Sequence, residues 1–255
     1  MSLPVSLREL MAERPVLGTF LKIPRFEIVD VLALSGFDFV VCDYEHSQMS
    51  VGEACDVVRA GRARGLPVLV RVPALDRGDI NRLLEAGAAG IQLARGSGRA
   101  AGELRKLVSY PPLGTRSVSL AQPAADYGMG VSLAAHFERS NSTVLAVGQF
   151  ETADYGDGID AAMAALDVAF IGPVDLSVDL GTPGQLDSAP MRAAAEALEA
   201  AAAARGVPMG IFAGSAEAAA DAVARGYRYI VAGSDLTMLA GGATQFSGLL
   251  QPAAG

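Results

Sequence analysis

The stretch Phe39-Val-Val-Cys-Asp-Tyr-Glu-His-Ser47 begins as an apolar run and changes abruptly to acidic and imidazole side chains. This pattern predicts a buried strand that carries Asp43, Glu45 and His46 at its carboxyl end. A histidine beside carboxylates can carry a proton near neutral pH. A solvated turn would explain the same residues, so a catalytic interpretation depends on partners from elsewhere in the chain.

Similar apolar segments recur along the chain, each bounded by Gly, Pro or charge. The predicted strands are 16–21, 37–42, 67–72, 90–93, 143–150, 168–171, 207–212 and 229–232. Helical periodicity alternates with them at 26–34, 50–64, 79–86, 100–108, 159–166, 193–204, 216–224 and from 236 onward. Only the stretch 109–141 is irregular, with one helix near 132–138, and a connection of that length is more often a functional loop than filler.

Continuous apolar strands that alternate with helices predict a parallel sheet covered by helices. Eight such units in 255 residues predict one (β/α)8 barrel domain over residues 1–255. A doubly wound sheet is the alternative, but no Gly-x-Gly-x-x-Gly motif follows the first strand.

Composition narrows the class of protein. A net charge of −8 argues against a nucleic acid partner. Every apolar run is interrupted by a charged residue, Gly or Pro before it reaches the length of a membrane-spanning helix. No secretory signal is visible at the N-terminus. Cys42 and Cys55 form no CxxC motif and are predicted to be small buried residues with reduced thiols, as in a cytoplasmic protein.

In a (β/α)8 barrel, catalytic side chains lie at the carboxyl ends of the strands. Polar residues that look scattered in the sequence are therefore expected on one rim. The residues at these ends are Lys22, Asp43, Glu45, His46, Arg71, Gln149, Glu151 and Asp175.

Glu151 and Asp175 each follow an apolar strand directly, and two carboxylates with a few waters suit Mg²⁺ or Mn²⁺. Capping of the following helix is the alternative for each. Arg71 lies within an apolar strand, so it requires an anionic partner. That partner is either a salt bridge to Asp43 or Glu45 or a substrate carboxylate or enolate.

Three further features of the sequence bear on the site. Lys22 at a strand end could form a Schiff base with a keto substrate, although its position beside Pro24 and Arg25 favours a solvated loop lysine. His136 lies in an uninformative stretch and is predicted to be at the surface. The backbone of Gly172-Pro-Val-Asp175 could offer N–H groups to a carboxylate.

Several motifs occur in order along most of the chain, from Gly18 to Leu239. They are Asp43-Tyr-Glu-His46, Val70-Arg-Val-Pro73, Tyr110-Pro-Pro-x-Gly-x-Arg116, Gln149-Phe-Glu-Thr152 and Phe170-Ile-Gly-Pro-x-Asp-Leu-Ser177. Each motif alone is weak, but the ordered set is specific. The chain resembles the metal-dependent (class II) pyruvate aldolases, which include 4-hydroxy-2-oxoheptanedioate aldolase and 2-dehydro-3-deoxyglucarate aldolase.

This resemblance implies a barrel whose last helix is exchanged between the subunits of a homo-hexamer. It implies a divalent ion (Mg²⁺, Mn²⁺ or Co²⁺), held by Glu151 and Asp175, that binds pyruvate and acts as a Lewis acid. Arg71 would stabilise the enolate oxygen. His46, oriented by Asp43 or Glu45, would move the proton of the aldol hydroxyl.

The resemblance also implies that Gln149 and the segment Gly172, Pro173, Val174 and Asp175 line the pyruvate site, and that Glu85 serves a neighbouring subunit's site. The chain departs from the family pattern at Tyr44, Ser117, Lys22 and Arg95. We hypothesise that Lys22 and Arg95 select an acidic or polyhydroxy aldehyde.

The function expected from the sequence is therefore reversible cleavage of a 4-hydroxy-2-oxo acid to pyruvate and an aldehyde. A citrate-lyase-type enzyme acting on a CoA thioester is one alternative, but no clear basic site for CoA phosphates is visible. A catalytically silent barrel that serves as an assembly protein is the other, and it should lack one of the rim groups, all of which are present.

Overall fold

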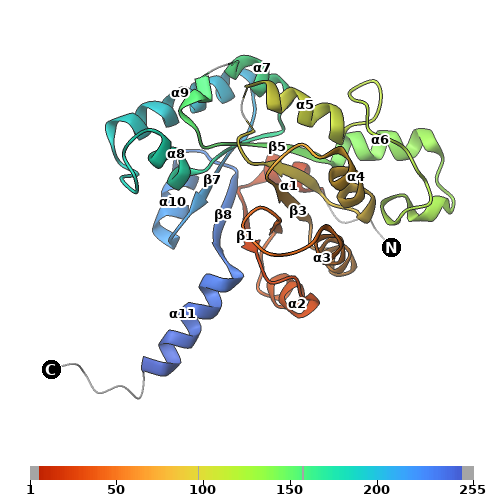
Figure 1. Ribbon diagram of the computed structural model, residues 1–255, viewed down its shortest axis with the longest axis horizontal. Coiled ribbons are helices and arrows are strands. Elements are labelled where there is room, and N and C mark those ends of the chain that lie inside the picture. The colour runs from red at the N-terminus through yellow and green to blue at the C-terminus, as the bar shows by residue number, and fades with distance from the viewer. Residues whose placement is uncertain (1–5, 97, 157, 249–255) are drawn as a thin grey trace.

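The computed structural model describes residues 6–96, 98–156 and 158–248. Its strands are parallel and close into an eight-stranded barrel in sequence order, with β1 hydrogen-bonded to β8 (Figure 1). The (β/α)8 barrel is confirmed, and the doubly wound alternative is wrong because an open sheet would leave β1 and β8 unpaired. The strands are β1 Val16–Leu21, β2 Phe39–Asp43, β3 Val68–Val72, β4 Gly90–Leu93, β5 Leu145–Phe150, β6 Val168–Ile171, β7 Met209–Ala213 and β8 Tyr229–Ser234.

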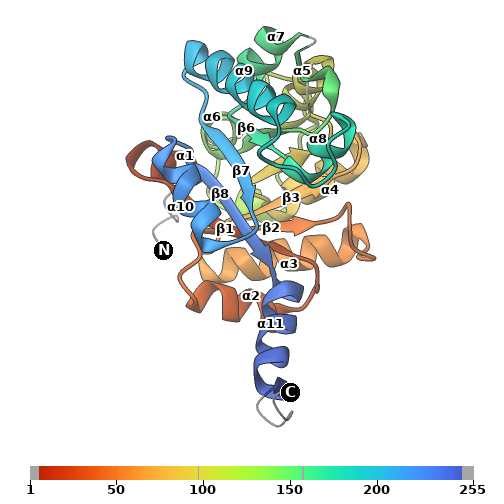
Figure 2. The same cartoon turned by 90° about the vertical axis from the view of Figure 1, so that its left-hand side faces the viewer.

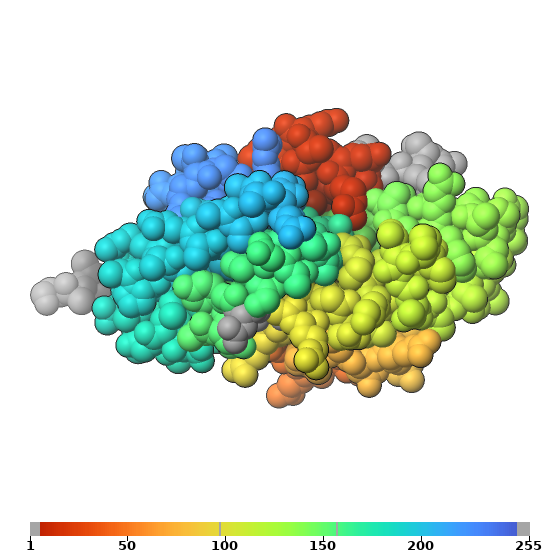
Figure 3. Space-filling model, turned by 90° about the horizontal axis from the view of Figure 1, so that it is seen from above, coloured from red at the N-terminus to blue at the C-terminus, as the bar shows by residue number. Residues whose placement is uncertain are grey.

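Helices surround the barrel. They are α1 Leu7–Glu13, α2 Phe26–Leu34, α3 Val51–Arg64, α4 Arg77–Ala86, α5 Gly98–Val108, α6 Leu133–Thr143, α7 Ile159–Ala165, α8 Pro173–Asp179, α9 Ala189–Arg205, α10 Ala216–Ala224 and α11 Asp235–Gly248, with short 3₁₀ turns at Pro123–Gly128 and Ala153–Gly156. Figure 3 shows α5, α7 and α9 side by side, in yellow to cyan, over one side of the molecule. No helix in the described part of the chain is long and apolar enough to cross a membrane.

The apolar strands are continuous because both of their faces are covered. In β2, Phe39 and Val41 pack inside the barrel, whereas Val40 and Cys42 pack in the layer between strands and helices. Successive side chains alternate between the two faces, so Asp43 follows Phe39 and Val41 into the interior. The period of the strand thereby delivers a carboxylate to the end of the barrel lumen.

The structure differs from the sequence prediction mainly in the predicted irregular stretch. Helix α6 starts at the Ser132 cap and continues to Thr143, so β5 begins at Leu145 rather than at Thr143. The short helix α8 is an additional element, and β2 extends one residue further, to Asp43.

Helix α11 leaves the barrel after β8 and projects away from it (Figures 1 and 2). It exposes large apolar side chains, among them Leu239 at 62% and Phe246 at 74%. Helix α2 also exposes Phe26 and Leu34. An apolar helix that is held this loosely by its own subunit is compatible with the predicted exchange between subunits, which stays a prediction.

Candidate active site

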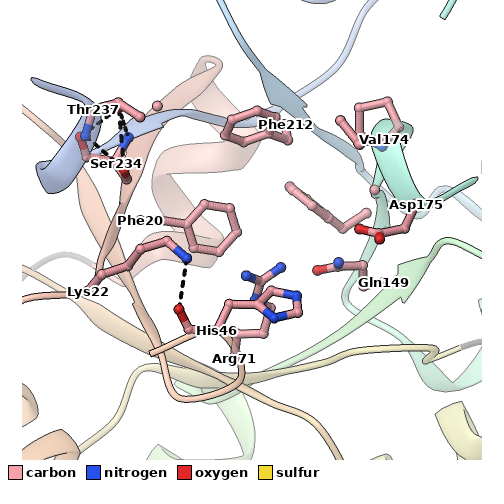
Figure 4. A pocket seen from close by; sticks show the side chains of 14 residues that line it. Phe20, Lys22, His46, Arg71, Gln149, Val174, Asp175, Phe212, Ser234 and Thr237 are labelled. Carbon is pink, nitrogen blue, oxygen red and sulfur yellow. Dashed lines mark hydrogen bonds between the residues drawn. The ribbon is translucent and has the colours of Figure 1, made fainter. Parts of the chain in front are cut away.

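A cavity of about 260 Å³ opens at the carboxyl ends of the strands. Its polar lining includes Lys22, His46, Arg71, Gln149 and Asp175, which come from different strand ends (Figure 4). Phenylalanine side chains from β1, β6 and β7 form its apolar walls, namely Phe20, Phe170 and Phe212. The predicted gathering of the rim residues at one site is therefore observed for these positions.

Asp43 is the centre of the polar network. Its side chain is fully buried and accepts hydrogen bonds from Arg71 Nε at 3.0 Å and Nη2 at 2.8 Å. Lys22 Nζ donates to Asp43 Oδ2 at 2.6 Å, and the backbone N–H of His46 donates to Oδ1 at 3.0 Å. A single carboxylate thus compensates two cations and fixes the turn after β2.

The electrostatic balance favours the ionised form of Asp43. Burial by itself would raise the pKa of this carboxyl group, but the hydrogen bonds and charge of Arg71, with the help of Lys22, lower it to about 2. The carboxylate is therefore a permanent anion at neutral pH. It serves to position its partners and is too weak a base to take a proton.

Arg71 is held on several sides. Besides its paired bonds to Asp43, its Nε lies 3.4 Å from Glu45 Oε2 and its guanidinium stacks 4.3 Å from the centre of the Phe20 ring. The Asp43 salt bridge that the sequence offered as one alternative is present. Nη1 makes no hydrogen bond within the described residues, so the same side chain can also contact a ligand in the cavity.

Glu45 and His46 form a neighbouring pair of a carboxylate and an imidazole. His46 Nε2 lies 3.6 Å from Glu45 Oε2, and the His46 side chain is 56% exposed towards the cavity mouth. Burial raises the pKa of Glu45, an effect that the nearby Arg71 opposes. Asp43 and Glu45 were both predicted to orient His46. Asp43 accepts a hydrogen bond from the His46 backbone N–H, and Glu45 faces the imidazole ring.

The expectation that Lys22 is a solvated loop residue is wrong. Only 23% of its side chain is exposed, and its ammonium group bonds to Asp43 and to the His46 carbonyl at 3.1 Å. The buried Asp235 accepts hydrogen bonds from the backbone N–H groups of Lys22 and Ile23 at 2.8–3.1 Å. This second carboxylate fixes the turn after β1, and it was not among the predicted site residues.

A buried chain of hydrogen bonds crosses the barrel interior to Glu151. Tyr229 donates to Gln92 at 3.3 Å, Gln92 donates to Gln149 at 2.7 Å, and Gln149 donates to Glu151 Oε2. Gln92 and Tyr229 were not predicted as site residues. For Gln92, the sequence did contain a signal, because it is a polar residue at an inward-facing position of the apolar strand Gly90-Ile-Gln-Leu93.

The surroundings of Glu151 and Asp175 fit a divalent cation. Glu151 is 7% exposed, and a Cβ at Gly172 would lie 3.1 Å from its Oε2, so glycine at this position leaves the carboxylate uncrowded. Asp175 is exposed, its side chain makes no hydrogen bond or ion pair in the described part of the chain, and it does not cap α8, whose N-cap is Gly172. The capping alternative for Asp175 is therefore wrong.

Within residues 6–96, 98–156 and 158–248, no three His, Cys, Asp or Glu side chains cluster closely enough to hold an ion. Glu151 and Asp175 follow neighbouring strands, β5 and β6, which are paired in register. Two carboxylates are a donor set that Mg²⁺ or Mn²⁺ accepts when water and substrate oxygens complete the coordination.

The residues that depart from the expected pattern lie outside the cavity, apart from Lys22. Tyr44 turns away and donates to Asp79 Oδ2 on α4 at 3.1 Å. Arg95 contributes its backbone N–H to Glu151 Oε1 at 2.9 Å, and its side chain is exposed, as is that of Ser117. Glu85 lies near the end of α4, accepts a hydrogen bond from Asn81, and does not line the cavity.

Two predictions about the remaining reactive side chains have opposite outcomes. Cys42 and Cys55 are free and buried, as predicted. His136 is 2% exposed, so its assignment to the surface is wrong. Its Nε2 lies 3.2 Å from the Tyr110 hydroxyl, within the stretch that the sequence left without a pattern.

The fold and the cavity define a (β/α)8-barrel protein with a charged small-molecule site at the carboxyl ends of its strands. Residues 17–241 match the profile of the HpcH/HpaI aldolase/citrate lyase family, and the chain belongs to that family.

Named relatives agree with this assignment. The chain is 32% identical over 237 residues to a hydroxypyruvate/pyruvate aldolase of Rhizorhabdus wittichii, with 91% of this chain and 92% of the relative covered. It is 30% identical to a 5-keto-4-deoxy-D-glucarate aldolase of Escherichia coli, with 81% of each chain covered. The crystal structure of an HpcH/HpaI aldolase from Desulfitobacterium hafniense superimposes with a TM-score of 0.87 at 29% identity, covering 97% of this chain and 98% of the other.

The network around Asp43 generates a prediction about acid stability. Because the folded-state pKa of about 2 lies below the unfolded value near 3.8, the ionised carboxylate stabilises the fold above pH 4, and this contribution disappears as the pH falls towards 2. We expect Asp43→Asn to lose on the order of 2 kcal/mol relative to the native chain at pH 6, and the difference to shrink on acidification. Urea denaturation from about pH 6 to about pH 2 measures it.

Asp56→Asn is the control, because it removes an equal charge from an exposed pair with Arg59. A difference between native chain and Asp43→Asn that stays constant over the whole pH range would contradict the assignment.

Proposed function

We propose that this chain is a metal-dependent aldolase that cleaves a 4-hydroxy-2-oxo acid reversibly to pyruvate and an aldehyde. The observation that carries the proposal is the content of one cavity. Arg71 is fixed by Asp43 with Nη1 left free, and the Glu45–His46 pair lies beside it. Asp175 lines the same cavity and follows β6, the neighbour of the strand β5 that Glu151 follows.

Glu151 and Asp175 would hold the divalent ion, which is Mg²⁺, Mn²⁺ or Co²⁺. When bound, the ion supplies a Lewis acid that lowers the energy of negative charge on the pyruvate oxygens. Gln149 orients Glu151 through its hydrogen bond, and the Gln92 and Tyr229 chain keeps Gln149 in place. Gly172 has no side chain to crowd Glu151, and we place the carboxylate end of the substrate beside this glycine.

Arg71 would stabilise the enolate oxygen. In cleavage, the bond between C3 and C4 of the substrate breaks and its electron pair moves to the C2 carbonyl, which becomes an enolate. The free Nη1 of Arg71 is a donor that costs no reorganisation, since Asp43 and Phe20 already hold the guanidinium group.

His46 would accept the proton of the C4 hydroxyl as the aldehyde forms, either directly or through water. The facing carboxylate of Glu45 stabilises the imidazolium that results. The same ring returns a proton in the synthetic direction. Lys22 is engaged with Asp43 and with the His46 carbonyl, which favours this mechanism over a Schiff base.

We also propose that the active assembly is a hexamer, in which α11 is exchanged between subunits and Glu85 acts at a neighbour's site. The exposed apolar side chains of α11 support the exchange. The position of Glu85 outside its own subunit's cavity is compatible with such a contribution.

The central test is pyruvate release from a panel of 4-hydroxy-2-oxo acids, coupled to lactate dehydrogenase. We expect activity that EDTA removes and that added Mg²⁺, Mn²⁺ or Co²⁺ restores, because the enolate needs the Lewis acid. Activity that survives complete chelation would contradict the metal-dependent mechanism. Cleavage of a CoA thioester, with no turnover of any 4-hydroxy-2-oxo acid, would support the citrate-lyase alternative.

The roles of Arg71 and His46 can be separated. Arg71→Ala should abolish both aldol cleavage and the exchange of pyruvate methyl protons with deuterated water, because both steps pass through the enolate. His46→Ala should reduce cleavage by about 100-fold or more, and should reduce the proton exchange much less. Nuclear magnetic resonance measures the exchange. Equal losses of both activities in His46→Ala would sink its assignment to the aldol hydroxyl.

The position of Lys22 sharpens the hypothesis about the aldehyde. Lys22 is part of the cavity wall, whereas Arg95 lies outside the cavity and only its backbone N–H contacts a site residue, Glu151. We expect Lys22→Ala to lower the ratio of kcat/KM for a carboxylate-bearing aldehyde to that for a neutral one by about tenfold. The diacid in the name of the Escherichia coli relative makes an acidic acceptor a reasonable substrate class.

Arg95→Ala is the matched control and should change that ratio less than about twofold, because its side chain is exposed. The ratio is the informative quantity, since loss of Lys22 also removes a partner of Asp43 and can lower all activities together. A ratio that is the same in Lys22→Ala as in the native chain would exclude Lys22 as a selectivity residue.

A further inference from the structure

A second cavity, of about 480 Å³, lies at the opposite end of the barrel. Pro67 and Val68 at the start of β3, Ala89 before β4 and Val144 before β5 form its floor. Helices α3, α4 and α6 and the stretch that begins at Arg116 contribute its walls. None of its lining residues lines the candidate active site, so a ligand bound here would not touch that site.

Arg116 is the unusual residue of this cavity. Its side chain is buried, with 5% of the residue exposed, and its Nη1 donates to Ser140 Oγ at 3.1 Å. Nε and Nη2 are buried and have no hydrogen-bond partner among the described residues. A buried guanidinium with two unmet donors and no anion costs several kcal/mol, which native proteins rarely tolerate without a reason.

The local contacts do not compensate the charge of Arg116. It lies 4.7 Å from the centre of the Tyr110 ring, a cation–π contact worth about 1 kcal/mol. Asp126 lines the cavity, but it is paired with Arg62 at 2.5 Å and with Arg139 at 3.5 Å. Glu85, on the neighbouring α4, makes no ion pair with Arg116 within the described residues and bonds to Asn81 instead.

The cavity as a whole therefore carries an excess of positive charge. Among its lining residues are the guanidinium groups of Arg62, Arg116 and Arg139 and a single carboxylate, that of Asp126. His136 is also buried there, and its Nδ1 has no partner in the described part of the chain. Burial lowers the pKa of His136, so its ring is neutral at pH 7 and offers a hydrogen bond but no charge.

The remaining lining suits a short carbon chain. Leu7, Val58, Leu66, Val68 and Leu84 present apolar surface between the arginines. A bare phosphate would leave most of this volume empty, and a long acyl chain would not match the charged lining. An anion with two carboxylates on a short aliphatic spacer matches both the net charge and the apolar wall.

We propose that this cavity is a binding site for a small dicarboxylate, one carboxylate of which pairs with the Arg116 guanidinium group once its Nε–Nη2 edge, which solvent does not reach in this structure, turns towards the cavity. Its other carboxylate lies towards Arg139 and Arg62. A carboxylate on Arg116 gives the buried guanidinium the paired acceptor that the chain itself does not provide. The site is independent of the proposed aldolase reaction, because it lies at the other end of the barrel.

Succinate is the probe, because it has no 2-oxo group and is a poor mimic of the proposed substrate. Isothermal titration calorimetry in phosphate-free buffer should show saturable binding of succinate to the full-length native assembly. Arg116→Gln should weaken it by about tenfold or more, the effect of losing a charge-assisted pair. Arg59→Gln removes an equal charge from an exposed site on α3 outside the cavity and should leave succinate affinity unchanged.

Arg71→Gln separates the two cavities, since it removes the arginine of the active site, and succinate should bind this variant as it binds the native chain. Arg116→Met guards against misfolding. If the buried charge awaits an anion, this variant should melt at or above the native temperature without succinate, and succinate should no longer raise its melting temperature.

Three results would overturn the proposal. The first is the absence of saturable succinate binding to the native chain, and the second is its loss in Arg71→Gln rather than in Arg116→Gln. The third is dissociation of the assembly by Arg116→Gln, seen by light scattering, in a chain that binds no succinate. In that case a carboxylate from a second copy of the chain is the partner of Arg116.

Discussion

The buried carboxylate of Asp43 is the constraint on which the candidate active site depends. It compensates Arg71 and Lys22 at once and holds the backbone of His46. Two cations can therefore stand at the end of an apolar barrel, where either one alone would be too costly to bury. Because Asp43 is held as an anion, the proposed mechanism assigns proton transfer to His46 with Glu45, and stabilisation of the enolate to Arg71.

The alternation of side chains along the strands explains how such a network is assembled. Phe39, Val41 and Asp43 point inward from β2, and Leu69 and Arg71 do so from β3. The register pairs Asp43 with Arg71, so the two charged groups meet across adjacent strands. A shift of one residue in either strand would place a charge among the helices and an apolar side chain in the lumen.

The two ends of the barrel handle buried charge differently. At the carboxyl end, Arg71 and Lys22 both pair with Asp43, and Arg71 Nη1 and the Asp175 carboxylate make no hydrogen bond within the described residues. At the amino end, the partners of the Arg116 side chain within the described residues are a hydroxyl group and an aromatic ring. The free-energy cost of burying a cation explains why Asp43 accompanies Arg71 and Lys22. The same cost is the reason for proposing an anion site beside Arg116.

The sequence by itself determined the barrel, because the period of two and the alternation with helices are local properties. Strands β1, β4 and β6 match their predicted ends, and the inward residues at the strand ends follow from the same count. Only the tertiary structure decided which charges pair, since that depends on barrel closure and on the reach of side chains. It moved Lys22 from solvent to Asp43, placed Gln92 and Asp235 behind the site, and buried His136. The spacing of residues along the chain does not determine which oxygen accepts a hydrogen bond from a given buried nitrogen, and these pairings set the chemistry of both cavities.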